Sequence, residues 1–259
     1  MKLYINKNGR KVFYRLDGNT AGRRLVLLNS LGTSTASWDD VVDHLSCDYH
    51  VLRIDKAGHG QSDPMTGART ISDNAEDVRD VMSHLEWQSA DICGISIGAM
   101  TAIELAARHP GVTGKLVLSN TSAYVPPEGL LHRIELIREG GISAASEKAV
   151  GRFFSPHHPK GDHPTYRRAL NDFHACDAES YIGWCQAIVA MDLRPLLLGI
   201  PNHCMSIIGK WDEATTPTMG HAVATSLQNV KVVELESGHL PYLEDPARYA
   251  ALLHGFLFQ

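Results

Sequence analysis

Residues 90–98 read ADICGISIG, a short apolar run that ends in a glycine–serine–glycine pattern. Residues 90–93 predict a buried strand, and the apolar periodicity of residues 97–108 predicts a helix directly after it. Ser96 then stands in a sharp strand-to-helix turn, where crowding admits only glycine at positions 94 and 98. Such a turn pushes the serine hydroxyl out over the sheet, above a helix N-terminus whose first free N–H, that of Ile97, could stabilise an oxyanion. The same glycine–serine–glycine pattern also occurs in turns that have no catalytic role. A nucleophilic role for Ser96 therefore depends on a base and a carboxylate elsewhere in the chain.

The strand-then-helix pattern continues on both sides of this turn. Alternating polarity around Asn8 and Gly9 predicts an antiparallel hairpin over residues 2–17. Further strands are predicted at 25–28, 50–54, 115–118, 204–208 and 230–235, with helices at 37–45, 71–85, 219–227 and 246–256. Because alternating strands and helices require crossover connections, we predict an α/β fold with a mainly parallel central sheet flanked by helices. A ligand site is expected at the carboxyl ends of the strands.

The alternation is interrupted between residues 122 and 196. Helical periodicity appears at 130–138, 143–152 and 180–190, with no convincing strand between them, and the His/Pro-rich residues 155–160 predict a loop. We therefore expect one core built from residues 1–121 and 197–259, carrying a helical cap, or lid, of residues 122–196.

Two further residues complete a pattern that Ser96 alone cannot establish. His239 follows the predicted strand that ends at Leu235, and Asp212 follows the one that ends at Ile208. A neutral serine needs a base to activate it, and the base needs a carboxylate to orient it. Each of the three residues stands just past a strand, in the chain order serine, acid, histidine. We predict Ser96, Asp212 and His239 as a catalytic triad.

A second oxyanion donor is expected on the loop after the first parallel strand. This loop contains Asn29, Ser30, Leu31 and Gly32, and the backbone N–H of Leu31 is the candidate. Residues 55–62, after the next strand, contain glycines and turn-forming polar residues, and we interpret them as a structural turn.

Composition excludes several classes of function. The chain has 259 residues, a net charge of -5 and no run of lysines and arginines, which argues against nucleic-acid or membrane-surface partners. Five widely spaced cysteines without a C-x-x-C pair suggest reduced thiols in the cytoplasm. No secretory signal, membrane span, metal site or cofactor is expected; the histidines near residue 158 have only one carboxylate close by, that of Asp162.

Several segments resemble the 3-oxoadipate enol-lactonases, a branch of the α/β-hydrolase superfamily. The similar segments are Asn-Ser-Leu-Gly-Thr at 29–33, Gly-His-Gly-Gln-Ser-Asp at 58–63, the turn at 94–98, Arg-Glu-Gly-Gly at 138–141, Met-Asp-Leu-Arg at 191–194 and Gly-His-Leu at 238–240. The resemblance implies an α/β-hydrolase fold and hydrolysis of the enol-lactone of 3-oxoadipate in aromatic catabolism, by the β-ketoadipate pathway. Ser96 would attack the lactone carbonyl and His239 would take its proton, giving an acyl-enzyme that water then hydrolyses.

The implied substrate carries a carboxylate, which a cation should bind. The family usually has Arg before Gly-His-Gly, whereas this chain has Ala57, preceded by Lys56. The candidate substrate-binding residues are Arg133, Arg138, Arg152, Phe153 and Lys56.

Other readings remain open. A carbon–carbon bond hydrolase of ring-cleavage products or a general carboxylesterase would use the same triad. A non-catalytic ligand receptor or a cofactor-free oxygenase could also use this scaffold. The sequence does not indicate an oligomeric state.

Overall fold

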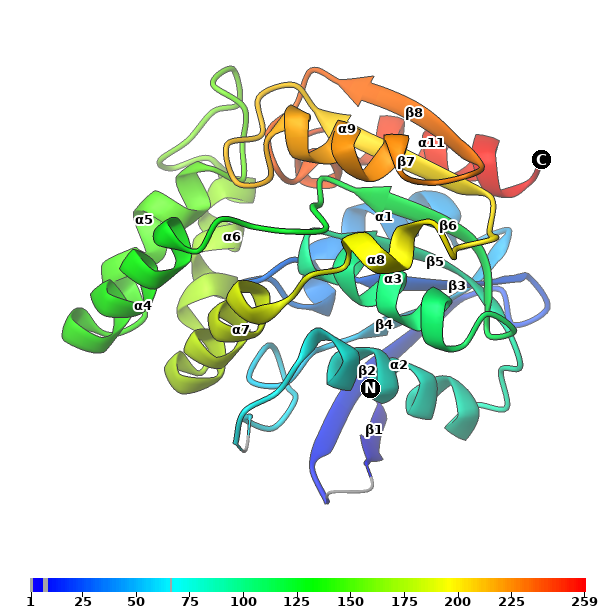
Figure 1. Cartoon of the computed structure of the whole chain (residues 1–259), viewed down its shortest axis with the longest axis horizontal. Helices are drawn as coiled ribbons and strands as arrows, with labels where there is room; N and C mark the ends of the chain where they lie inside the picture. Colours follow the sequence, from blue (N-terminus) through cyan, green and yellow to red (C-terminus); the bar gives the residue numbers. More distant parts are fainter. Residues whose placement is uncertain (1, 7–8, 66) are drawn as a thin grey trace.

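The protein is built around a twisted sheet, seen in a computed structural model that describes residues 2–6, 9–65 and 67–259 (Figure 1). The described strands, in sheet order, are β1 (Lys2–Ile5), β2 (Lys11–Gly18), β4 (Tyr49–Ile54), β3 (Arg23–Leu28), β5 (Ala90–Ile95), β6 (Thr113–Ser119), β7 (Cys204–Gly209) and β8 (Val230–Leu235). β2 pairs antiparallel with β1 and β4, and the remaining pairs are parallel. The predicted α/β fold with a mainly parallel sheet is confirmed. Asn8, at the predicted hairpin turn, lies outside the described residues.

Helices cover the sheet and explain why its central strands are apolar. α1 (Asp39–Leu45), preceded by a 3-10 turn at Thr35–Trp38, packs against α11 (Pro246–Leu257), and α2 (Ile71–His84) packs against α3 (Ile97–Arg108). α9 (Pro217–Thr225) packs on β7, and α8 (Arg194–Leu197) and α10 (Pro241–Glu244) are short. Every residue of β5 and β7 is buried, as expected for strands covered on both faces, whereas β8 at the edge exposes Val232.

In the described part of the chain, four longer helices and the short α8 lie between β6 and β7. The four longer ones are α4 (Glu128–Gly140), α5 (Ser143–Gly151), α6 (Pro164–His174) and α7 (Ala178–Ala190). Figure 1 shows them gathered on the side of the sheet toward which the arrowheads of β6 and β8 point. None of the helices in the described part of the chain has the length and apolarity to cross a membrane.

α6 was not predicted from the sequence. Only Tyr166, Ala169 and Phe173 on this helix are buried, so its apolar stripe is narrow and the intervening residues are polar. Its proline stands at the first helical turn, where a missing N–H costs nothing, rather than marking a break. The helix forms because Phe173 is fully buried in the core, which is a tertiary contact.

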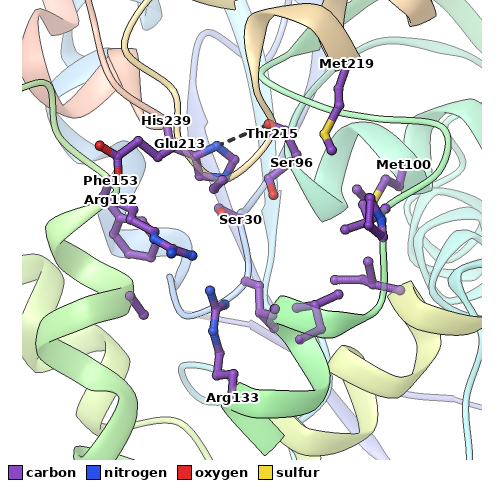
Figure 2. Close-up of a pocket in the computed structure, with 18 residues that line it drawn as sticks. Ser30, Ser96, Met100, Arg133, Arg152, Phe153, Glu213, Thr215, Met219 and His239 are labelled. Carbon is purple, nitrogen blue, oxygen red and sulfur yellow. Dashed lines mark hydrogen bonds between the residues drawn. The ribbon is translucent and has the colours of Figure 1, made fainter.

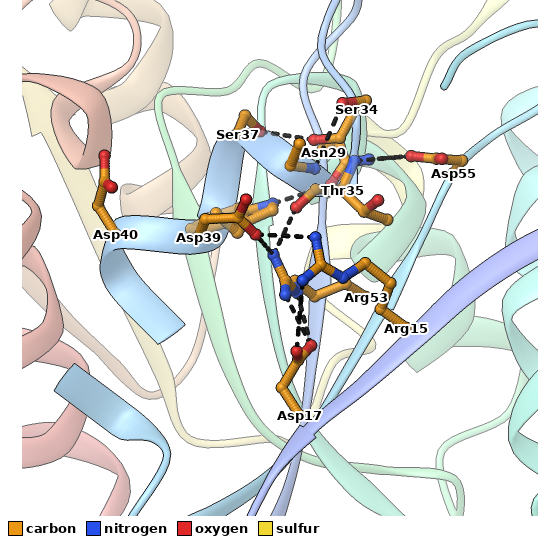
Figure 3. Close-up of polar contacts among 12 residues, drawn as sticks. Arg15, Asp17, Asn29, Ser34, Thr35, Ser37, Asp39, Asp40, Arg53 and Asp55 are labelled. Atoms are coloured by element: carbon orange, nitrogen blue, oxygen red, sulfur yellow. Dashed lines mark hydrogen bonds and ion pairs between the residues drawn. The ribbon is translucent and has the colours of Figure 1, made fainter. Parts of the chain in front are cut away.

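A buried arginine holds the loop that follows β3 (Figure 3). Arg53 on β4 forms ion pairs with Asp17 at 2.7 Å and Asp39 at 2.5 Å, and its Nη1 donates to the carbonyl oxygen of Thr35 at 2.7 Å. The N–H of Thr35 donates to Asp55 Oδ1 at 2.6 Å. Thr35 is therefore held through both of its backbone groups, which fixes one end of the loop that contains Leu31.

Candidate active site

The turn at Ser96 has the strained geometry that the glycine pattern predicts. Ser96 has φ 55° and ψ −123°, a backbone conformation that residues other than glycine rarely adopt. A Cβ at Gly94 would lie 2.3 Å from the carbonyl oxygen of Gly98, and a Cβ at Gly98 would lie 2.3 Å from that of Leu28. Neither position can accept a larger residue without moving the backbone. The strain is held by hydrogen bonds to β6 and its following loop, including that from Ser96 N to Ser119 O at 3.0 Å.

His239 and Asp212 meet at the carboxyl ends of β8 and β7. His239 Nδ1 lies 2.8 Å from Asp212 Oδ2, and both side chains are buried. An Nδ1–H that donates to the carboxylate leaves Nε2 as the free nitrogen of the ring. His239 and Ser96 line the same cavity, as Figure 2 shows. The structure thus brings the three residues of the predicted triad to one place.

The Asp212 carboxylate is held by three further donors. Its Oδ1 accepts from the N–H groups of Ala214 at 2.7 Å and Thr215 at 2.9 Å, and its Oδ2 accepts from Thr215 Oγ1 at 2.8 Å. These bonds fix the orientation of the carboxylate and so place the oxygen that faces His239. The role of Thr215 was not predicted from the sequence. An Asx turn is formed by Ala214 N, two residues after Asp212, and Thr215 directly follows that turn.

Asn120, also missed from the sequence, joins the loops that carry the histidine and the aspartate. Its Nδ2 donates to the carbonyl oxygens of Gly238 at 2.7 Å and His239 at 2.9 Å, and its Oδ1 accepts from Gly209 N at 2.9 Å. Its φ of 42° lies in the left-handed region, which asparagine tolerates better than most residues. One buried side chain therefore sets the spacing of the β7 and β8 loops.

We expect Asn120→Ala to lower the free energy of unfolding by about 2–4 kcal/mol, because buried carbonyl and N–H groups lose their partners. Urea unfolding followed by circular dichroism measures the change. Asn202→Ala is a matched control, since Asn202 also donates from Nδ2 to backbone carbonyls, those of Thr113 and Gly114, at the opposite end of β6. A loss at Asn120 no greater than at Asn202 would contradict the clamping role.

The proposed oxyanion donors both have free N–H groups. In the described part of the chain, neither Leu31 N nor Ile97 N has a hydrogen-bond partner. Ile97 is the first residue of α3, where an unpaired N–H is expected. Both residues are buried, and Leu31 lines the cavity with Ser96. A buried N–H group that has no hydrogen-bond partner in the protein can donate to an oxygen atom of a bound ligand.

The cavity has a volume of about 230 Å³, and residues of α4, α5 and α7 line it together with residues that follow β3, β5, β7 and β8. Arg133 from α4 and Arg152 from the end of α5 point into it, below Ser96 and His239 in Figure 2. Neither arginine forms an ion pair within the described residues. The neighbouring Tyr181 raises the pKa of Arg133, whose Nη1 lies 3.1 Å from the phenol oxygen. The described lining therefore carries two arginines without ion-pair partners against one acidic side chain, that of Glu213 (Figure 2).

Phe153 lines the cavity beside His239, with ring centroids 6.2 Å apart. Its carbonyl accepts from Leu240 N at 2.8 Å. The next segment is held in the same way, because the Glu244 carboxylate accepts from Ser155 N at 2.9 Å and Ser155 Oγ at 2.6 Å. The segment that follows α5 is thus joined to the loop that carries His239 and to α10.

Two of the predicted substrate-binding residues lie elsewhere. Arg138 is exposed near the end of α4 and is not among the described residues that line the cavity. It lies more than one helical turn beyond Arg133, on a different face of the helix. Lys56 is buried but also does not line the cavity, because its ammonium donates to the carbonyl oxygens of Ser30 at 2.6 Å and Thr33 at 3.4 Å. The structure therefore does not bring Arg138 or Lys56 to the cavity that Ser96 and His239 line.

The chain is similar to known proteins of one family. Residues 25–252 match the α/β hydrolase family. Relatives include 3-oxoadipate enol-lactonase 2 of Acinetobacter baylyi, 28% identical over 91% of this chain and 89% of that protein. Similar structures include the enol-lactonase of Burkholderia xenovorans, with a TM-score of 0.92, 33% identity, and coverage of 97% of this chain and 98% of that one. Another is a hydrolase of Pseudomonas aeruginosa, with a TM-score of 0.94, 29% identity, and coverage of 100% and 98%.

The match spans most of the chain, including the strands and loops that hold Ser96, Asp212 and His239. The resemblance to 3-oxoadipate enol-lactonases is confirmed at moderate identity. The chain belongs to the α/β-hydrolase family and is a carboxylic ester hydrolase.

Proposed function

We propose that the protein hydrolyses a carboxylate-bearing enol-lactone, that of 3-oxoadipate, through an acyl-enzyme on Ser96. The observation that carries this proposal is one cavity with Ser96 and His239 on one side and two arginines without a carboxylate partner on the other. The names of the enol-lactonase relatives support the same substrate.

In the first half of the reaction, Ser96 Oγ attacks the lactone carbonyl while its proton passes to His239 Nε2. Asp212 holds the imidazole by Nδ1 and stabilises the imidazolium that forms. The N–H groups of Leu31 and Ile97 stabilise the oxyanion. The ring C–O bond then breaks, and the ring oxygen leaves as an enol after taking the proton from His239.

In the second half, the released enol tautomerises to a ketone and water cleaves the acyl-enzyme. His239 Nε2 removes a proton from the water, whose oxygen attacks the acyl carbonyl in the same oxyanion hole. Ser96 leaves with a proton from the imidazolium, and the product carries two carboxylates. Residues 122–196 act as the cap that recognises the substrate, while the core performs the chemistry.

A comparison of two enol-lactones tests the substrate. α-Angelica lactone has the same ring but a methyl group where the 3-oxoadipate lactone has a carboxymethyl group. We expect kcat/KM to favour the carboxylate-bearing lactone by about 100-fold or more, because charge-assisted hydrogen bonds to two arginines are lost with the methyl group. Equal values for the two, or faster cleavage of a carbon–carbon bond in a ring-cleavage product, would overturn the proposal.

We further expect Arg133→Met and Arg152→Met each to lower kcat/KM for the carboxylate-bearing lactone by about tenfold to a hundredfold. Turnover of α-angelica lactone should stay within about threefold, because the arginines lie away from its reacting bond. Arg138→Met is the matched control, since it removes an exposed arginine from the same helix as Arg133. Loss of activity toward both lactones would show that the arginines support the fold rather than the carboxylate.

A further inference from the structure

Lys56 lies behind the loop that supplies one of the two oxyanion donors. Its ammonium donates to the carbonyl oxygen of Ser30 at 2.6 Å. The carbonyl of Ser30 and the N–H of Leu31 belong to the same peptide unit. In a trans peptide these two groups point in opposite directions. A carbonyl turned toward Lys56 therefore turns the Leu31 N–H away from it, toward the cavity that Ser30, Leu31 and Ser96 line.

We propose that Lys56 is a positioning residue that polarises the Ser30–Leu31 peptide, so that its charge strengthens the oxyanion hole from behind. A cation on the carbonyl draws electron density through the peptide and makes the N–H a stronger donor. The effect is largest when the carbonyl substrate gains negative charge, and so it acts on the transition state. This inference rests on the proposed function, because it requires Leu31 to serve as an oxyanion donor.

Hydrogen bonds that do not involve Lys56 also hold the loop in its shape. The effect of the Lys56 charge can therefore be measured separately from any effect on the loop structure. Ser30 O also accepts from Thr33 N at 3.3 Å and Thr33 Oγ1 at 3.1 Å, and Gly32 N donates to His59 Nε2 at 3.0 Å. Gly32 has φ 83°, as the third residue of a type II turn requires. Loss of the ammonium therefore removes a charge while the turn retains its hydrogen bonds.

The surroundings of Lys56 make its charge sensitive to pH. The charged and titratable groups that face it are Asp55, His59, Asp172 and Cys176. Burial lowers the pKa of Lys56 to about 8, although the thiol and the two carboxylates oppose this shift. Burial raises the pKa of Cys176 to about 12 and lowers that of His59 well below its usual range, while the pKa values of Asp55 and Asp172 are raised. Within this group, only Lys56 titrates near pH 8.

The experiment measures kcat/KM from pH 6 to 10 with α-angelica lactone, because this profile reports the titration of the free enzyme. In the wild type we expect a step down of about tenfold centred near pH 8, a smaller effect than the loss of a whole oxyanion donor. The rate should level off above the step, because the neutral amine still occupies its place. Lys56→Met should show no step and should hold the lower rate at every pH.

Lys115→Met is the matched control. Lys115 also donates to backbone carbonyls, those of Phe256 and Leu257, but far from the cavity, so this variant should keep the wild-type rate and step. A wild type without the step, or Lys56→Met that keeps either the step or the full rate, overturns the inference. The step in the wild-type pH profile is measured without any variant. The inference can therefore still be overturned if the Lys56→Met protein fails to fold. A wild type whose lactone turnover equals that of Ser96→Ala would instead refute the proposed function.

Discussion

Ser96→Ala should lower kcat for lactone hydrolysis by about 10⁴-fold to 10⁶-fold, the loss expected when a serine hydrolase loses its nucleophile. The alanine has no hydroxyl oxygen to attack the lactone carbonyl and form the acyl-enzyme. The measurement is kcat for α-angelica lactone, together with labelling of the protein by a fluorophosphonate probe. Both signals should vanish in the variant.

Ser122→Ala is the control for this result. Ser122 is buried on the loop after β6, but its hydroxyl donates to the carbonyl of Tyr124 rather than lining the cavity. This variant should retain both turnover and labelling. If Ser96→Ala hydrolyses the lactone at the wild-type rate, the serine mechanism fails and only the fold assignment stands.

Asp212→Asn should lower kcat by about 10⁴-fold while the protein remains folded. The amide can still accept from Ala214 and Thr215 through one oxygen, but an NH₂ group would face His239 Nδ1. The imidazole would then place its proton on Nε2, where it cannot accept the proton of Ser96. Steady-state kinetics measures the loss, and thermal unfolding shows that the fold is retained.

Thr215→Val separates orientation of the carboxylate from its charge. The valine removes the hydroxyl that donates to Asp212 Oδ2 at 2.8 Å, but both backbone N–H bonds to Oδ1 remain. We expect a loss of about tenfold or less, the scale of one neutral hydrogen bond. Equal losses in Asp212→Asn and Thr215→Val would indicate that Asp212 acts only as a structural acceptor.

Local pattern predicted most of the fold because strands, helices and turns depend on neighbouring residues. The alternation of apolar strands and amphipathic helices predicted the parallel sheet, and the glycines around Ser96 predicted the strained turn. α6 was not predicted because most of its residues are polar and its apolar stripe is narrow. This stripe stabilises a helix only when Phe173 packs into the core.

The candidate site shows the same division at the level of single side chains. Asp212 and His239 could be proposed because a triad requires these residue types after particular strands. Thr215 and Asn120 could not, because their roles consist of hydrogen bonds to residues that only folding brings near. Lys56 was expected to contact a substrate carboxylate, but its ammonium is directed at the Ser30 carbonyl behind the oxyanion loop.

The sequence by itself determined the fold class, the turn at Ser96 and the order of the three candidate catalytic residues, because each follows from local pattern or chain order. Only the tertiary structure decided which cations face the cavity. Arg133 and Arg138 lie on one helix and look equivalent in sequence, yet the packing of α4 turns Arg133 inward and leaves Arg138 in solvent. The direction of a side chain depends on what its helix packs against, and that partner lies far away in the chain.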